Sequence, residues 1–136
     1  MTILVGYTPT PPGRAALAAA TAEASTSRRP LVVVNTSRGD ALDDPTFAQR
    51  ADLDWLRTTL EEAGVAYSIR QEVRNREPAD ELIDACREVA AELCVIGIRR
   101  RTAVGKMLLG SNANRILMEA PCPVLTVRAD SWPTRQ

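Results

Sequence analysis

The fold of this chain is decided by residues 93–127, LCVIGIRRRTAVGKMLLGSNANRILMEAPCPVLTV. Two apolar runs of strand length, residues 93–98 and 122–127, stand on either side of a basic loop and of a helix that starts at Gly110-Ser111. A strand, a loop, a helix and a second strand in this order are typical of a parallel βαβ crossover. We therefore expect both strands to lie in one parallel sheet.

The junction between the basic loop, residues 99–109, and the helix predicts an anion-binding site. Backbone N–H groups in a first helical turn have no intrahelical partner, and the helix dipole adds partial positive charge there. Gly110 can adopt backbone angles that other residues avoid, and the Ser111 hydroxyl can cap the helix or bind a phosphate. The other interpretation is that the glycines serve only turns and close packing, while Ser111 caps the helix.

The rest of the chain continues this alternation. Residues 31–36 are aliphatic and mostly β-branched without alternation, which predicts a central strand covered on both faces. Residues 65–73 alternate partly, which favours an edge strand with one wet face. The remaining expected elements are a strand at residues 2–7, a proline-rich loop at 8–13, and helices at 14–24, 46–63 and 78–92. The solvent side of the last helix is expected to carry its charged residues Asp80, Glu81, Asp84, Arg87 and Glu88. Together they predict an α/β fold, an open five-stranded parallel sheet with helices on both faces.

Composition limits the possible functions. A length of 136 residues favours one domain, and a formal net charge of zero argues against electrostatic binding to nucleic acid or to an anionic membrane as the main role. The chain has no histidine, so the commonest general base and transition-metal ligand is missing, and no metal site is expected. Cys86, Cys94 and Cys122 lack CxxC spacing and stand in apolar contexts, so we interpret them as reduced, buried thiols of a cytoplasmic protein.

From residue 95 onward the chain resembles the universal stress protein family. Nucleotide-binding members carry Gly, two residues, Gly, nine residues and then Gly-Ser or Gly-Thr after the fourth strand. Gly97 and Gly110-Ser111 match this pattern, and Arg100 replaces the middle glycine. The surrounding residues are similar too, namely Val95-Ile96 before the motif and Ala120-Pro121-Cys122-Pro123-Val124 after it. The resemblance implies a Rossmann-like, adenine nucleotide alpha hydrolase-like domain at residues 1–129, with strand order 3-2-1-4-5, followed by a tail at residues 130–136.

The resemblance also implies a nucleotide site, because ligands of such sheets bind where the strand order reverses, here between the first and fourth strands. The ligand would be ATP, with Mg²⁺, or another adenine nucleotide. Besides Arg100, Thr8 departs from the family, which commonly has an aspartate there. The Arg100 side chain can block close backbone approach or grip a phosphate, and the Thr8 hydroxyl can replace one carboxylate contact. The predicted nucleotide-binding residues are Tyr7, Thr8, Thr36, Ile96, Gly97, Arg99, Arg100, Gly110, Ser111, Asn112 and Ala113.

We expect a stress-response regulator with at most slow, incidental ATP hydrolysis, because no general base or magnesium carboxylate is evident around the crevice. The alternative is an interaction module of the same fold that binds no nucleotide and uses the arginine loop toward a protein partner. A nucleotidyl-transferring enzyme is weaker, because histidine is absent. The last strand is apolar for an edge, and family members dimerise through it. Homodimer contacts are expected at Pro123, Val124, Leu125 and Val127.

Overall fold

The computed structural model describes residues 1–37, 50–73, 77–98 and 110–129. In these ranges strands and helices alternate along the chain. The elements are β1 (Thr2–Gly6), α1 (Pro11–Ser27), β2 (Leu31–Ser37), α2 (Arg50–Ala63), β3 (Tyr67–Val73), α3 (Pro78–Glu88), β4 (Ala91–Ile98), α4 (Ser111–Glu119) and β5 (Val124–Arg128). The predicted basic loop and the predicted tail lie outside the described residues, as do the first residues of the predicted second helix.

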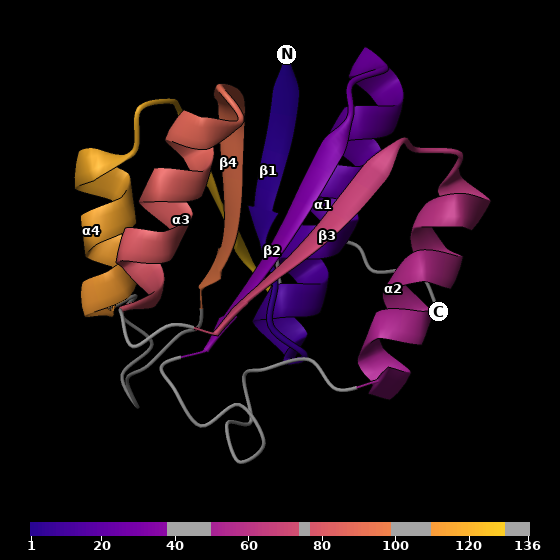
Figure 1. Cartoon of the computed structure of the whole chain (residues 1–136), viewed down its shortest axis with the longest axis horizontal. Helices are drawn as coiled ribbons and strands as arrows, with labels where there is room; N and C mark the ends of the chain where they lie inside the picture. The colour runs from indigo at the N-terminus through magenta and orange to yellow at the C-terminus, as the bar shows by residue number, and fades with distance from the viewer. Residues whose placement is uncertain (38–49, 74–76, 99–109, 130–136) are drawn as a thin grey trace.

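The strands form one parallel sheet in the order β3-β2-β1-β4-β5 (Figure 1). The central strand β1 pairs with β2 on one side and with β4 on the other. Gly6, the last residue of β1, lies opposite Val34 of β2 and Ile96 of β4. The predicted α/β fold and strand order are therefore confirmed, and the order reverses between β1 and β4.

Helices cover both faces of the sheet, with α1 and α2 on one face and α3 and α4 on the other (Figure 1). Neighbouring residues of a strand point to opposite faces, so β1 sends Val5 into the core under α1 and Leu4 into the core under α3. Residues buried on both faces explain why the central strands read as continuous apolar runs. The side of α1 that faces the sheet consists largely of alanines, which let the helix lie close to the strands.

The first helix begins earlier than the sequence predicted. α1 starts at Pro11, whereas the prediction placed residues 11–13 in a loop and started the helix near Arg14. The Thr10 hydroxyl accepts a hydrogen bond from the Gly13 N–H at 3.3 Å and so caps the helix. Proline is tolerated in a first helical turn because its missing N–H would have no partner there.

Several further boundaries and one burial prediction were wrong. α3 ends at Glu88 rather than near residue 92, and β4 starts at Ala91 rather than at residue 93. Ala90, with φ of 52°, makes the tight turn between them. β3 starts at Tyr67 and β5 at Val124, each two residues later than predicted. Glu81, expected on the solvent side of its helix, is only 4% exposed.

No helix in the described ranges is long and apolar enough to cross a membrane.

Candidate functional site

A pocket of about 180 Å³ opens at the carboxyl ends of β1 and β4, where the strand order reverses. We call it the crevice. Open α/β sheets bind their ligands at this position. The crevice is lined by Gly6, Tyr7, Thr8, Val34, Pro78, Leu82, Ile96, Gly97, Asn112, Ala113 and Ile116.

The crevice brings together six of the predicted nucleotide-binding residues: Tyr7, Thr8, Ile96, Gly97, Asn112 and Ala113. Gly110 and Ser111 are not among the lining residues, but they stand at the start of α4, directly before Asn112 and Ala113 in the sequence. Thr36 lies in β2, two residues beyond Val34. Arg99 and Arg100 lie outside the described residues. Sequence reasoning missed the wall that α3 contributes, Pro78 and Leu82, because no motif marks it.

The floor of the crevice is apolar. Val34 and Ile96 come from strands on either side of β1, and Leu82 and Ile116 come from α3 and α4. A Cβ on Gly6 would stand 2.9 Å from a terminal methyl carbon of Leu82, so this glycine lets α3 approach the end of β1. Such a surface suits the faces of a base or the carbon edge of a sugar.

The backbone at the exit of β1 is fixed by three polar contacts. The Tyr7 N–H donates to the Val34 carbonyl at 2.9 Å, and the Tyr7 carbonyl accepts from the Asn35 side-chain amide at 2.8 Å. The Asn35 side-chain oxygen accepts in turn from Gln71 Nε2 at 3.1 Å. Asn35 is fully buried. Sequence reasoning missed Asn35, although a polar residue inside an apolar strand run was the available signal.

The Tyr7 ring lies away from the crevice, in the core under α1 and α2. It stacks on Trp55 of α2, with 6.3 Å between the ring centroids and 28° between the ring planes. Burial raises the pKa of the Tyr7 hydroxyl above its ordinary value. Tyr7 therefore borders the crevice mainly through its backbone.

Thr8 stands where the family commonly has an aspartate. Its hydroxyl oxygen lies 2.8 Å from that of Thr10, the residue that caps α1. A hydroxyl has one donor and two acceptor sites, so a hydrogen bond to Thr10 still leaves Thr8 capacity for a ligand. The start of α1 is packed tightly against this residue, because a Cβ on Gly13 would stand only 1.9 Å from the Thr8 carbonyl oxygen.

Gly97 is required by packing. A Cβ at this position would stand 2.2 Å from the carbonyl oxygen of Pro12, in the first turn of α1. The close-packing interpretation of the sequence therefore accounts for the first glycine of the motif. The same contact places the first turn of α1 next to the end of β4, at the border of the crevice.

The start of α4 has the features of an anion site. Gly110 is its N-cap residue, with φ of −69° and ψ of 168°, angles that any residue can adopt. Within the described part of the chain no side chain caps this helix. The N–H groups of its first turn, next to the crevice, have no intrahelical partner and can bind an anion. Ser111 is exposed beside them.

Asn112 has a structural partner that the sequence did not predict. Its side-chain oxygen accepts a hydrogen bond from the Ala79 N–H at 3.2 Å, so it caps α3 from the neighbouring helix. Arg115 of α4 pairs with Asp80 of α3 at 2.6 Å. These contacts hold the starts of α3 and α4 together, and both helices line the crevice.

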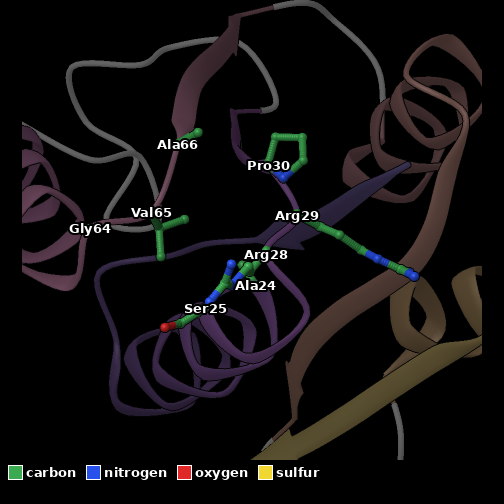
Figure 2. A pocket seen from close by; sticks show the side chains of 8 residues that line it. All are labelled: Ala24, Ser25, Arg28, Arg29, Pro30, Gly64, Val65 and Ala66. Atoms are coloured by element: carbon green, nitrogen blue, oxygen red, sulfur yellow. The ribbon is translucent and has the colours of Figure 1, made fainter.

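A second pocket, of about 500 Å³, lies at the opposite ends of the strands, where α1 and α2 end (Figure 2). Figure 2 shows the Arg29 side chain extending away from the other lining residues, and this side chain forms an ion pair with Glu92 of β4. Helix C-termini carry partial negative charge, which opposes anion binding here. No group of three or more acidic, histidine or cysteine residues in the described part of the chain could hold a metal ion.

The fold and the crevice define a doubly wound α/β protein with a pocket at its topological switch point, the position of a candidate ligand site. More particularly, the chain belongs to the universal stress protein family, whose model matches residues 1–128. A universal stress protein of Mycolicibacterium smegmatis is 44% identical over 126 residues, which cover 93% of this chain and 96% of that relative. A Thermus aquaticus universal stress protein is 34% identical and covers similar shares, 93% and 98%.

Solved structures agree with this assignment. The structure of a universal stress protein from Archaeoglobus fulgidus is similar with a TM-score of 0.78 and 29% identity, covering 93% of this chain and 97% of that one. An Archaeoglobus fulgidus universal stress protein in complex with dAMP gives a TM-score of 0.71 and 26% identity, with coverage of 93% and 96%.

Proposed function

We propose that the crevice binds an adenine nucleotide and that the protein acts as a stress-response regulator through this binding. The observation that carries the proposal is the first turn of α4, which no described side chain caps, beside an apolar pocket at the ends of β1 and β4. The dAMP complex of the related Archaeoglobus fulgidus protein supports it.

In the proposed complex, the phosphate lies at the start of α4. The N–H groups of Asn112 and Ala113 and the Ser111 hydroxyl donate hydrogen bonds to it. The base and sugar lie against the apolar floor, and the Thr8 hydroxyl contacts the sugar. Arg99 and Arg100 are still predicted to contact the phosphate. If the nucleotide is ATP, Mg²⁺ is also predicted to bind its phosphates. Ligand pockets usually measure about 300–1,000 Å³. The crevice formed by the described residues is smaller, about 180 Å³, so in the proposed complex it forms only the floor of the nucleotide site.

The proposed role is regulatory rather than catalytic, with ATP hydrolysis at most slow and incidental, and the proposed location is the cytoplasm. The interaction module without a nucleotide is less favoured, because the crevice combines an apolar floor with first-turn helix amides. Both versions include a homodimer through β5, which pairs only with β4 in the described sheet.

The β5 residues differ in what they can offer a second copy. Leu125 is 39% exposed, and Pro123 is also exposed. Val124 is partly buried against the core under α3 and α4, and Val127 is buried in the core under α1. Val127 would therefore contribute through its backbone, while Leu125 contributes its side chain.

The deciding experiment is to denature freshly purified protein, identify the small molecules released, and titrate the stripped protein with AMP, cyclic AMP, ADP and ATP by calorimetry. We expect a released adenine nucleotide or saturable binding of at least one of these ligands. An empty protein together with flat titrations for all four would reject nucleotide binding and would leave the interaction module.

A further inference from the structure

The side-chain amide of Asn112 is engaged at one end only. Asn112 lines the crevice, and its Oδ1 accepts the hydrogen bond from the Ala79 N–H at 3.2 Å. A backbone N–H can only donate, so the amide atom that faces it must be the oxygen. Nδ2 is on the other limb of the planar amide and is turned away from the Ala79 nitrogen. The contact with α3 therefore fixes which way the amide lies.

The nitrogen of this amide is available to a ligand. Nδ2 carries two hydrogens to donate, and within the described ranges the side chain of Asn112 makes no hydrogen bond besides the one from Ala79. The buried side-chain polar atoms without a partner in this part of the chain are the Tyr7 hydroxyl oxygen and one carboxylate oxygen of Glu92. Nδ2 is not one of them, and Asn112 is partly exposed. Nδ2 is therefore open to solvent.

The start of α3 explains why Oδ1 stays with Ala79. Pro78, the first residue of α3, has no N–H, and the N–H groups of Asp80 and Glu81 donate to the carbonyl of the residue before the helix, at 3.0 and 3.3 Å. The Ala79 N–H is thus the first-turn donor that needs a partner from outside α3. Asn112 supplies that partner, so its oxygen is committed before any ligand arrives.

The place of Asn112 in α4 directs its side chain toward the proposed phosphate position. Asn112 is the second residue of α4, and the Asn114 N–H donates to the Gly110 carbonyl at 3.0 Å in the first turn of the helix. The N–H groups before Asn114 have no partner within the helix. Because Cα–Cβ bonds of a helix tilt toward its N-terminus, the Asn112 side chain projects toward the same end as these N–H groups. Nδ2 can therefore act together with them.

The electrostatics of the crevice favour an anionic acceptor for Nδ2. The Ala79 N–H belongs to the N-terminus of α3, which carries partial positive charge, and a donor on Oδ1 polarises the amide so that Nδ2 donates more strongly. None of the described residues that line the crevice is acidic. Hydrogen bonds to charged groups are stronger than those between neutral groups, so a phosphate oxygen gains most from this donor.

We propose that the Asn112 side chain binds the nucleotide phosphate through Nδ2 while its Oδ1 stays on the Ala79 N–H. This contact, which rests on the proposed nucleotide-binding function, adds a side-chain donor to the backbone N–H groups at the start of α4. One amide then joins the phosphate to the first turns of both α4 and α3. A nucleoside lacks the phosphate and does not complete this connection.

Two substitutions separate the roles of the two amide atoms. Asn112→Asp keeps an oxygen for the Ala79 N–H but replaces the Nδ2 donor with a second, negatively charged acceptor. Asn112→Ala removes both atoms and adds no charge. Asn114→Asp is the matched control for charge, because it places the same carboxylate on an exposed position two residues further along α4.

The wild-type protein and these variants are titrated by calorimetry with adenosine and with the best-bound of AMP, cyclic AMP, ADP and ATP. We expect nucleotide affinity to fall about tenfold or more in both Asn112 variants, and clearly less in Asn114→Asp. Adenosine affinity should not change in Asn112→Asp. Urea unfolding of the stripped proteins should find Asn112→Asp more stable than Asn112→Ala, which would show that a missing cap does not cause the loss of affinity.

The outcomes distinguish this contact from the function on which it rests. If Asn112→Asp binds the nucleotide as tightly as Asn114→Asp does, or if Asn112→Ala binds it as wild type does, Nδ2 is not a ligand donor although the protein binds nucleotide. An equal loss of adenosine affinity would place the contact on the nucleoside and overturn the phosphate assignment. Flat titrations of the wild type with all four nucleotides would reject nucleotide binding itself, and this contact with it.

Discussion

At the scale of single residues, the exit of β1 depends on one buried amide. Asn35 donates to the Tyr7 carbonyl and accepts from Gln71, so it joins β1, β2 and β3 at the edge of the sheet that carries the crevice. A buried polar group is stabilising only while its partners are present. Asn35 is thus a positioning residue for the backbone that leads into Thr8.

Replacing Asn35 should destabilise the folded protein, although Asn35 does not itself line the crevice. Asn35→Leu leaves the Tyr7 carbonyl without its donor, and each unsatisfied buried group costs about 1–3 kcal/mol. We expect the free energy of unfolding in urea to fall by about that amount, with a smaller loss in Gln71→Ala, because Gln71 is only partly buried. Equal stability of Asn35→Leu and wild type would contradict the assigned role.

The two glycines that line the crevice differ in what an added methyl group would meet. In Gly97→Ala the new Cβ meets a backbone oxygen of Pro12, whereas in Gly6→Ala it meets the flexible end of Leu82. Overpacking against backbone costs about 1–3 kcal/mol, and a side-chain end can move aside more easily. Thermal unfolding should therefore rank Gly97→Ala below Gly6→Ala, and the reverse order would contradict the packing explanation of Gly97.

The proposed phosphate contact can be tested at Ser111. Ser111→Ala removes one hydrogen bond to a charged ligand, which is worth about 1.5–3 kcal/mol, so nucleotide affinity should fall about tenfold or more. Ser27→Ala, at the far end of α1, is the matched control and should bind as wild type does. Calorimetric titration of both variants with the nucleotide that binds best decides the matter; unchanged affinity in Ser111→Ala would remove Ser111 from the site.

At the scale of elements, the sequence predicted which segments form strands and helices but not where all of them begin. Prolines look the same in a loop and in a first helical turn, so the start of α1 at Pro11 was missed. The burial of Glu81 was missed because helical spacing alone set it on the solvent side.

The crevice could be predicted only in part, because some of its residues belong to a motif and others meet only through tertiary packing. Motif residues at the end of β4 and the start of α4 were found because their spacing matches a family pattern. The strand order that joins them to Thr8 came from the resemblance and not from the residues. The α3 wall and the Asn112 contact to Ala79 arise only from tertiary packing between helices.

That contact predicts that Asn112 stabilises the protein without any ligand. Asn112→Ala removes the cap of α3, and loss of such a cap costs about 0.5–2 kcal/mol. Arg115→Ala breaks the pair with Asp80, but both side chains are partly exposed, so its effect should be smaller. Urea unfolding of the stripped variants measures both. A stable Asn112→Ala that binds nucleotide poorly would instead mark Asn112 as a ligand contact.

At the scale of the whole molecule, the two edges of the described sheet are unequal. On β3, Arg70 pairs with Glu88 at 2.6 Å, and Ser68 is exposed. On the other side, Leu125 of β5 is 39% exposed, and Leu117 and Met118 of α4 are 38% and 83% exposed. An exposed strand edge with apolar side chains invites pairing with another chain, while polar side chains discourage it. This asymmetry favours β5 as the surface for a second copy.

Leu125→Lys should therefore convert the proposed homodimer into a monomer. A lysine at this exposed position of β5 places two like charges near each other across a two-fold interface, whose contacts occur twice. Ser68→Lys is the matched control, since it adds the same charge to the β3 edge, and it should leave the assembly unchanged. Light scattering over a range of protein concentrations gives the mass of each variant. A wild-type monomer, or a dimer that survives Leu125→Lys and is lost in Ser68→Lys, would reject β5 as the interface. The second of these results would move the interface to β3.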